Sequence, residues 1–181
     1  IGMNASVAKK IDEILKLDEM ADTTSKAELS DHTIVFEHVT FSYGEGQPVL
    51  KDVSFTVPDG KVTALVGVSG SGKSTAASLI CRFWDITEGQ ICLGGVPLNQ
   101  IPLSDLMSQI SFVTQNTFLF KKSIRDNIMM GNPEATEEEM MQAAKDAVCH
   151  DFIMRLPKGY DTVIDKETKL SGGEKQRITL A

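Results

Sequence analysis

At residues 67–75 the chain reads Gly67-Val68-Ser69-Gly70-Ser71-Gly72-Lys73-Ser74-Thr75. Glycines at this spacing let successive backbone N–H groups turn inward around a chain of phosphates. The apolar, β-branched run at 61–66 has the length of a buried strand, and residues 74–83 carry apolar side chains at helical spacing. We therefore expect the loop to join a strand to a helix, whose N-terminus adds partial positive charge toward a bound phosphate.

The chemistry of this loop suggests a role for each of its last three side chains. Lys73 can reach the β- and γ-phosphates as a point charge, Ser74 is placed to bind Mg²⁺, and Thr75 can add a phosphate hydrogen bond. The simpler interpretation is a Gly/Ser turn with a solvated lysine. The flanking strand and helix favour nucleotide binding, but the loop alone does not separate kinases, GTPases and transport motors.

A second glycine motif lies nearly a hundred residues later, at Leu170-Ser171-Gly172-Gly173-Glu174. Ser171 and Glu174 have the S-x-x-E spacing of a capping box, which predicts a helix start. Capping does not require two glycines, whereas Gly172 and Gly173 leave bare amides at the helix N-terminus where an anion could dock. The sequence therefore contains two helix starts suited to phosphate.

The two motifs together resemble the ATP-binding cassette (ABC) family, whose signature motif reads Leu-Ser-Gly-Gly-Gln; here Glu174 takes the last place. Residues 118–120, 123–128 and 159–162 resemble its exporter subgroup. The resemblance implies that Tyr43 stacks on adenine and that Gln115 helps Ser74 to bind Mg²⁺. Without it, Tyr43 would be a packed tyrosine at a strand end and Gln115 an ordinary polar strand terminus. The implied ATP-binding residues are Tyr43, Gly67, Val68, Ser69, Gly70, Ser71, Gly72, Lys73, Ser74, Thr75 and Gln115.

The resemblance also implies a head-to-tail dimer with a second nucleotide-binding domain. In that dimer Leu170, Ser171, Gly172, Gly173 and Glu174 of one subunit contact the ATP held by the other. A transmembrane domain would be the second partner, which places the assembly on the cytoplasmic face of a membrane. The transported substrate is not readable from a motor domain, because selectivity lies in the membrane helices.

The implied fold is an α/β P-loop NTPase core with a parallel sheet, an N-terminal antiparallel β subdomain and a helical subdomain inserted before the signature motif. Alternating strand and helix patterns support this architecture. Strands are predicted at 33–43, 53–57, 61–66, 90–93 and 110–114, and a helix capped by Thr136 and Glu139 follows them. The expected boundaries are 1–31 for a connector helix and linker, 32–181 for the nucleotide-binding domain, and about 32–60, 61–120 and 121–172 for its β subdomain, core and helical subdomain.

Hydrolysis in the resembled family needs an apolar strand ending in Asp-Glu after the signature motif, and a later histidine. The residues after Glu174 contain neither. We expect a domain that is truncated after its signature motif and binds ATP without efficient hydrolysis, which would belong to the intact parent. The strand carrying Asp-Glu would lie beside residues 61–66, so we also expect an exposed apolar edge and marginal stability.

Composition restricts the class of protein further. The formal charge of −7 argues against a nucleic-acid surface, which needs a basic footprint. Three widely spaced cysteines without a C-x-x-C pair predict reduced thiols, and no apolar run approaches the length of a membrane span, so a soluble chain is expected. Two alternatives stay open: a module that binds ATP without ever hydrolysing it, and a soluble ABC protein that is not coupled to transport.

Overall fold

The computed structural model describes residues 7, 9–12, 15–16, 20–114, 117–165 and 168–181. The chain divides into two compact units, Ile1–Ser111 and Phe112–Ala181. Near the N-terminus the described residues among 7–15 are helical, and Val7, Ile11 and Leu15 expose their apolar side chains. Within the described part of the chain, no helix combines the length and the apolar character that crossing a membrane requires.

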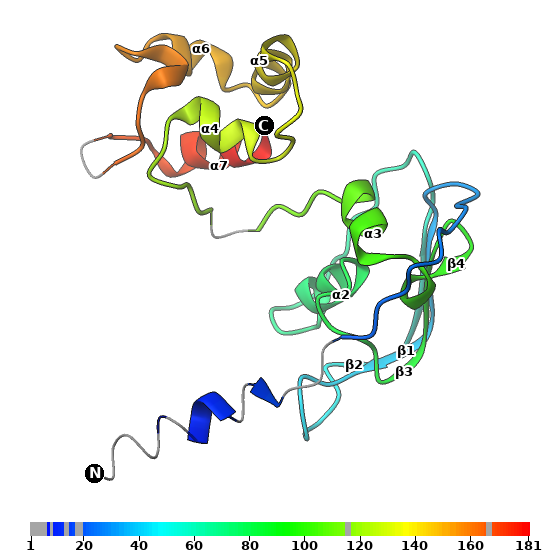
Figure 1. Ribbon diagram of the computed structural model, residues 1–181. Coiled ribbons are helices and arrows are strands. Elements are labelled where there is room, and N and C mark those ends of the chain that lie inside the picture. The colour runs from blue at the N-terminus through cyan, green and yellow to red at the C-terminus, as the bar shows by residue number, and fades with distance from the viewer. Residues whose placement is uncertain (1–6, 8, 13–14, 17–19, 115–116, 166–167) are drawn as a thin grey trace. The chain divides into compact units, whose positions relative to one another are not determined.

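The first unit is built on a four-stranded sheet with the order β2-β1-β3-β4 (Figure 1). Every pair of neighbouring strands is antiparallel. The strands at 33–43 and 53–57 predicted from the sequence are confirmed as β1 and a longer β2. The strand bounds are Ile34–Phe41 for β1, Leu50–Val57 for β2, Glu88–Leu93 for β3 and Val96–Pro97 for β4.

The expectation of a parallel sheet is corrected in the described part of the chain. Residues 61–66 and 110–114 form no strand there, and the segment predicted at 90–93 pairs antiparallel with β1 as part of β3. Every residue from 61 to 70 is exposed, and Val62 and Val66 are almost fully so. Parallel strands are stable when neighbours cover both edges and both faces, and these segments have no strand beside them. The exposed strand edge predicted at 61–66 is therefore not formed: these residues are exposed, but they lie in no strand.

The core of the first unit lies between the sheet and two helices, α2 (Lys73–Ile80) and α3 (Leu103–Gln109). The helix predicted after the glycine loop is therefore confirmed, although it ends before residue 83. A short 3-10 turn, η1 (Leu98–Gln100), precedes α3. The buried side chains of this core are Phe36, Val39, Phe41, Leu50, Ala76, Leu79, Ile91, Leu93, Leu98, Ile101 and Leu106.

The second unit is helical, as expected for the residues before the signature motif. Its elements are α4 (Ile124–Met129), α5 (Glu137–Asp146), α6 (His150–Met154), the 3-10 turn η2 (Gly159–Asp161) and α7 (Gly172–Leu180). The predicted capping box of Thr136 and Glu139 opens α5. The Arg125 side chain of α4 joins two other elements, because its guanidinium donates to Asp161 at 3.2 Å and to Glu137.

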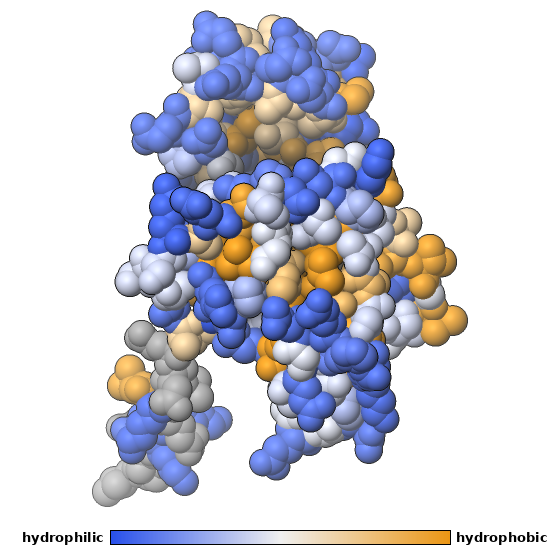
Figure 2. Space-filling view, turned by 90° about the vertical axis from the view of Figure 1, so that its right-hand side faces the viewer, coloured by the Kyte–Doolittle hydropathy of each residue, from blue (hydrophilic) through white to orange (hydrophobic). Residues whose placement is uncertain are grey.

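A separate hydrophobic core holds these helices together. It buries Ile124, Ile128, Met140, Ala144, Ala147, Cys149, Phe152, Ile153, Tyr160, Ile164 and Ile178. The predicted shared face of Met140, Ala144 and Ala147 is confirmed by their burial. Hydrophobic side chains also reach the molecular surface, where they form the orange areas of Figure 2.

Candidate nucleotide-binding site

The glycine loop at 67–75 turns directly into α2. Gly70 and Gly72 have φ values of 82° and 84°, in the left-handed region that favours glycine. Gly72 is the N-cap of α2, and a Cβ atom there would lie 2.5 Å from Leu50 Cδ2 and 3.2 Å from the Val49 carbonyl oxygen. A side chain at Gly72 would therefore disturb both the helix start and the packing of the loop on β2.

Lys73 is the first residue of α2, and its side chain folds back across the loop. Its Nζ donates to the carbonyl oxygens of Gly67 at 3.0 Å and Val68 at 2.8 Å, and to Ser71 Oγ at 3.2 Å. Among the described residues, no carboxylate forms a salt bridge with this ammonium. A positive charge without a counter-charge at a helix N-terminus is suited to an anion, which would replace the carbonyl oxygens as the acceptor.

The hydroxyl groups that follow Lys73 have different surroundings. Ser74 is exposed, which leaves its Oγ accessible to a metal ion. Thr75 is buried, and its Oγ1 is hydrogen-bonded to the Tyr43 hydroxyl at 3.0 Å. The hydroxyl of Thr75, predicted to reach a phosphate, is thus engaged with the side chain predicted to reach adenine.

This contact brings together two residues that are distant in the sequence. Tyr43 lies two residues after the end of β1, and Thr75 lies in the first turn of α2. Gln115, the second predicted Mg²⁺ ligand, lies outside the described residues. Among those that are described, no group of three or more His, Cys, Asp or Glu side chains is placed to hold a metal.

The signature motif begins α7 in the second unit. Ser171 is the N-cap, and the predicted capping box is confirmed: the Glu174 backbone N–H donates to Ser171 Oγ at 3.3 Å, and Glu174 Oε2 accepts from the Ser171 backbone N–H at 2.8 Å. A Cβ atom at Gly172 would meet no heavy atom within 4 Å. The first turn of α7 therefore presents open backbone next to a carboxylate.

The carboxylate of Glu174 is held in its charged form. Hydrogen bonds from the backbone N–H and the hydroxyl of Ser171 lower its pKa, and the positive charges of Arg177 and Arg155 add smaller contributions in the same direction. A negative charge at a helix N-terminus stabilises the helix. The same charge reduces the attraction of this helix start for a second anion.

Comparison with known proteins establishes the family. The profile described as ABC transporter matches residues 50–181. This chain belongs to the ABC transporter family. The matched region includes both glycine motifs.

Individual ABC proteins agree with this assignment. A Staphylococcus aureus ATP-binding/permease protein whose name proposes multidrug export is 44% identical over 156 residues, which is 85% of this chain and 27% of that protein. The mycobactin import ATP-binding/permease protein of Mycobacterium tuberculosis is 47% identical over 149 residues, which is 82% of this chain and 17% of the relative. A solved structure of a bacterial Atm1-family ABC exporter with ATP bound has 37% identity and a TM-score of 0.87, over 96% of this chain and 31% of that one.

These relatives are three or more times longer than the matched part, and two of them are named for both ATP binding and a permease. This chain therefore spans about a third or less of the length of each of these relatives. Family membership implies nucleotide binding and the ATPase class. It does not assign roles to single residues of this chain.

Two side chains that contact the predicted site or its flanking turn, Trp84 and Arg82, were not predicted from the sequence. Trp84 follows α2 and packs against Tyr43, with ring centroids 5.1 Å apart. Arg82 is buried beside it, and its Nε donates to Asp85 Oδ1 at 3.0 Å. Tyr43, which contacts Trp84, is distant in the sequence, and Asp85, which binds Arg82, lies across an irregular turn, so no local pattern predicts either contact. The available signal was compositional, because Trp84 is the only tryptophan of the chain.

Proposed function

We propose that this chain is the ATP-binding motor domain of an ABC exporter and that residues 67–75 hold Mg-ATP. The observation that supports this most directly is the Lys73 ammonium, which lies at the N-terminus of α2 without a salt bridge to any described carboxylate. The phosphates of ATP would accept the Lys73 hydrogen bonds that Gly67, Val68 and Ser71 accept in this structure. The loop amides and the helix dipole add to the attraction for its phosphates.

The other predicted site residues complete this proposal. The exposed Ser74 hydroxyl and Gln115 would bind Mg²⁺ on the phosphates, since hydroxyl and amide oxygens suit a hard cation. Tyr43, whose hydroxyl lies beside α2, would stack its exposed ring on adenine. The remaining loop residues would contribute backbone N–H groups.

We further propose a head-to-tail dimer, in which Leu170 and residues 171–174 of one copy close on ATP bound to the other. The open backbone at Gly172 and Gly173 supports this role, since a phosphate could approach those amides directly. The dimer would work with a transmembrane domain on the cytoplasmic face of a membrane. The Staphylococcus aureus relative and the Atm1-family structure favour export, although the mycobacterial relative is named for import.

The proposal separates binding from hydrolysis. Residues 175–181 contain no Asp-Glu pair and no histidine to orient an attacking water. Phosphoryl transfer depends on positioning that water and on stabilising the developing charge. We therefore propose that these 181 residues bind ATP but turn it over inefficiently.

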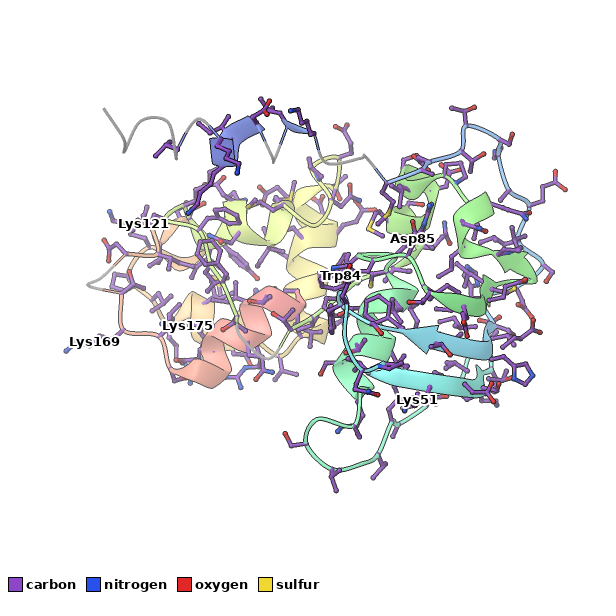
Figure 3. All side chains as sticks on the ribbon, turned by 90° about the horizontal axis from the view of Figure 1, so that it is seen from below. Lys51, Trp84, Asp85, Lys121, Lys169 and Lys175 are labelled. Atoms are coloured by element: carbon purple, nitrogen blue, oxygen red, sulfur yellow. The ribbon has the colours of Figure 1, made fainter. Side chains whose placement is uncertain are left out.

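The test is a calorimetric titration of the chain with Mg-ATP, together with an assay of phosphate release. Replacing Lys73 by alanine should weaken ATP binding about 10- to 100-fold, the range expected for hydrogen bonds to a charged group. Lys51→Ala is the matched control, because Lys51 is an exposed lysine on β2 of the same unit (Figure 3). Equal affinities for the Lys73 and Lys51 variants would contradict the proposed site. Phosphate release that depends on Lys73 would contradict inefficient turnover.

A further inference from the structure

Trp84 lies in the turn after α2, where its side chain is 44% exposed (Figure 3). Its ring meets the Tyr43 ring at 87° with centroids 5.1 Å apart, the edge-to-face arrangement that aromatic pairs prefer. Phe41 of β1 makes a similar contact from the buried side of Tyr43, at 4.9 Å and 84°. Two nearly perpendicular rings therefore fix the plane of the Tyr43 ring.

The Tyr43 ring is held at its far end as well. Its hydroxyl is hydrogen-bonded to Thr75 Oγ1 at 3.0 Å, in the first turn of α2. Even so, 55% of Tyr43 remains exposed. The ring thus combines a fixed orientation with a free surface, which is what a stacking platform for a base requires, because an ordered platform loses little conformational entropy on binding.

The turn that carries Trp84 is itself anchored. Arg82 is buried with a φ of 53°, and its Nε donates to Asp85 Oδ1 at 3.0 Å across the turn. Its Nη2 donates to the Ala21 carbonyl oxygen in the linker before β1. Trp84 lies between Arg82 and Asp85 in sequence, so this buried arginine restricts the path of the backbone on which Trp84 stands.

We propose that Trp84 is a positioning residue for the adenine base: it holds Tyr43 in the orientation that stacks on the base, and it takes no part in binding the phosphates. This inference rests on the proposed function, since it assumes that Tyr43 contacts adenine. It adds that recognition of the base depends on the turn after α2, whereas recognition of the phosphates depends on the loop before that helix.

The first experiment compares two ligands by calorimetry on the 181-residue chain: ATP, and inorganic tripolyphosphate, which lacks the base. Trp84→Ala should weaken ATP binding about 2- to 10-fold, which is the change in affinity that corresponds to the interaction energy of one aromatic pair. It should leave tripolyphosphate binding unchanged. Trp84→Phe should restore most of the ATP affinity, because it keeps an aromatic ring beside Tyr43. Phe118→Ala, which removes an exposed ring from the second unit, should change neither affinity.

The second experiment uses the emission of Trp84, which is the only tryptophan of the chain. ATP should change this emission in the wild-type chain, whereas tripolyphosphate should not. Tyr43→Ala should remove most of the response to ATP. This measurement needs no substitution at Trp84, so it tests whether the base reaches the Tyr43–Trp84 pair even if Trp84→Ala fails to fold.

The outcomes separate the two proposals. Unchanged ATP affinity in Trp84→Ala, or an equal loss for ATP and tripolyphosphate, would overturn the role of Trp84 as a positioning residue. An emission response that is the same for both ligands would also overturn it. Failure of the wild-type chain to bind ATP, or normal ATP binding by Lys73→Ala, would instead refute the proposed function on which the inference rests.

Discussion

At the scale of single residues, Glu174 is the side chain whose chemistry has the clearest consequence. Its carboxylate accepts from the Ser171 backbone N–H and hydroxyl, which lowers its pKa and keeps it charged near neutral pH. The charge lies beside the open amides of Gly172 and Gly173. In the proposed dimer, a phosphate of ATP would approach the same helix start and meet this negative charge.

Replacing Glu174 by glutamine should therefore strengthen ATP-dependent association of two copies. Glutamine can keep the capping geometry, because either residue serves in a capping box. Removing the charge should strengthen association by about 3- to 10-fold at low salt, because it removes the repulsion between one carboxylate and a phosphate near the protein surface. Sedimentation with Mg-ATP at low and high salt checks this, since screening should remove the difference. Weaker association of Glu174→Gln at both salt concentrations would show that the carboxylate contributes to the contact.

At the scale of elements, the three capping boxes of the second unit share one dependence on pH. They begin α4, α5 and α7, and in each the acidic residue has a lowered pKa because hydrogen bonds from the capping residue favour its charged form. A carboxylate whose pKa is lower in the folded than in the unfolded chain stabilises its helix at pH values above the unfolded-state pKa, which is about 3.9 for Asp and 4.3 for Glu. This contribution is lost as the pH falls through the folded-state pKa. The acidic residues are Asp126, Glu139 and Glu174.

We therefore expect acid to destabilise the second unit selectively. Urea unfolding followed by helical circular dichroism should show a falling midpoint from pH 5 to below about pH 4, where the three carboxylates become protonated. The combined variant Asp126→Asn, Glu139→Gln and Glu174→Gln should be less stable at pH 7 and should lose much of this pH dependence. A wild-type midpoint that stays constant over the same range would contradict the expected role of the caps.

At the scale of the whole molecule, the two hydrophobic cores have no described residue in common. Each unit therefore has its own cooperative source of stability. Trp84 belongs to the first unit, so fluorescence reports that unit. Helical circular dichroism is weighted toward the second unit, which contains α4, α5, α6 and α7, although α2 and α3 of the first unit also contribute.

We expect the two signals to give separate urea transitions. Ile91→Ala in β3 should shift the fluorescence transition, and Ile153→Ala in α6 the circular dichroism transition, each by about 2–5 kcal/mol for a buried isoleucine. Mg-ATP at 100 times its Kd should stabilise the first transition by about 2.7 kcal/mol. At the same ATP concentration, Lys73→Ala should reduce that shift to about 0.4–1.4 kcal/mol, because its Kd is expected to be 10- to 100-fold higher. Coincident transitions that both respond to either substitution would show that the two units unfold as one.

Much of the candidate site was predictable because its signals are local. The turn into α2 follows from glycines that can adopt positive φ, and the capping boxes of α5 and α7 follow from a three-residue spacing. The sequence also singled out Tyr43, although not its neighbours Thr75 and Trp84, and its stacking on adenine stays a prediction. Contacts such as that of Tyr43 with Thr75 and Trp84 connect residues that no local pattern relates.

By itself, the sequence determined the two glycine motifs, their helix starts and a resemblance to the ABC family that comparison confirmed. Only the tertiary structure decided that the described strands all pair antiparallel, that residues 61–66 stay exposed, and that Trp84 lies against Tyr43. The physical reason is the range of the interactions. Caps and glycine turns are satisfied within a few residues, whereas a strand or an aromatic ring depends on which distant partner is present to cover it.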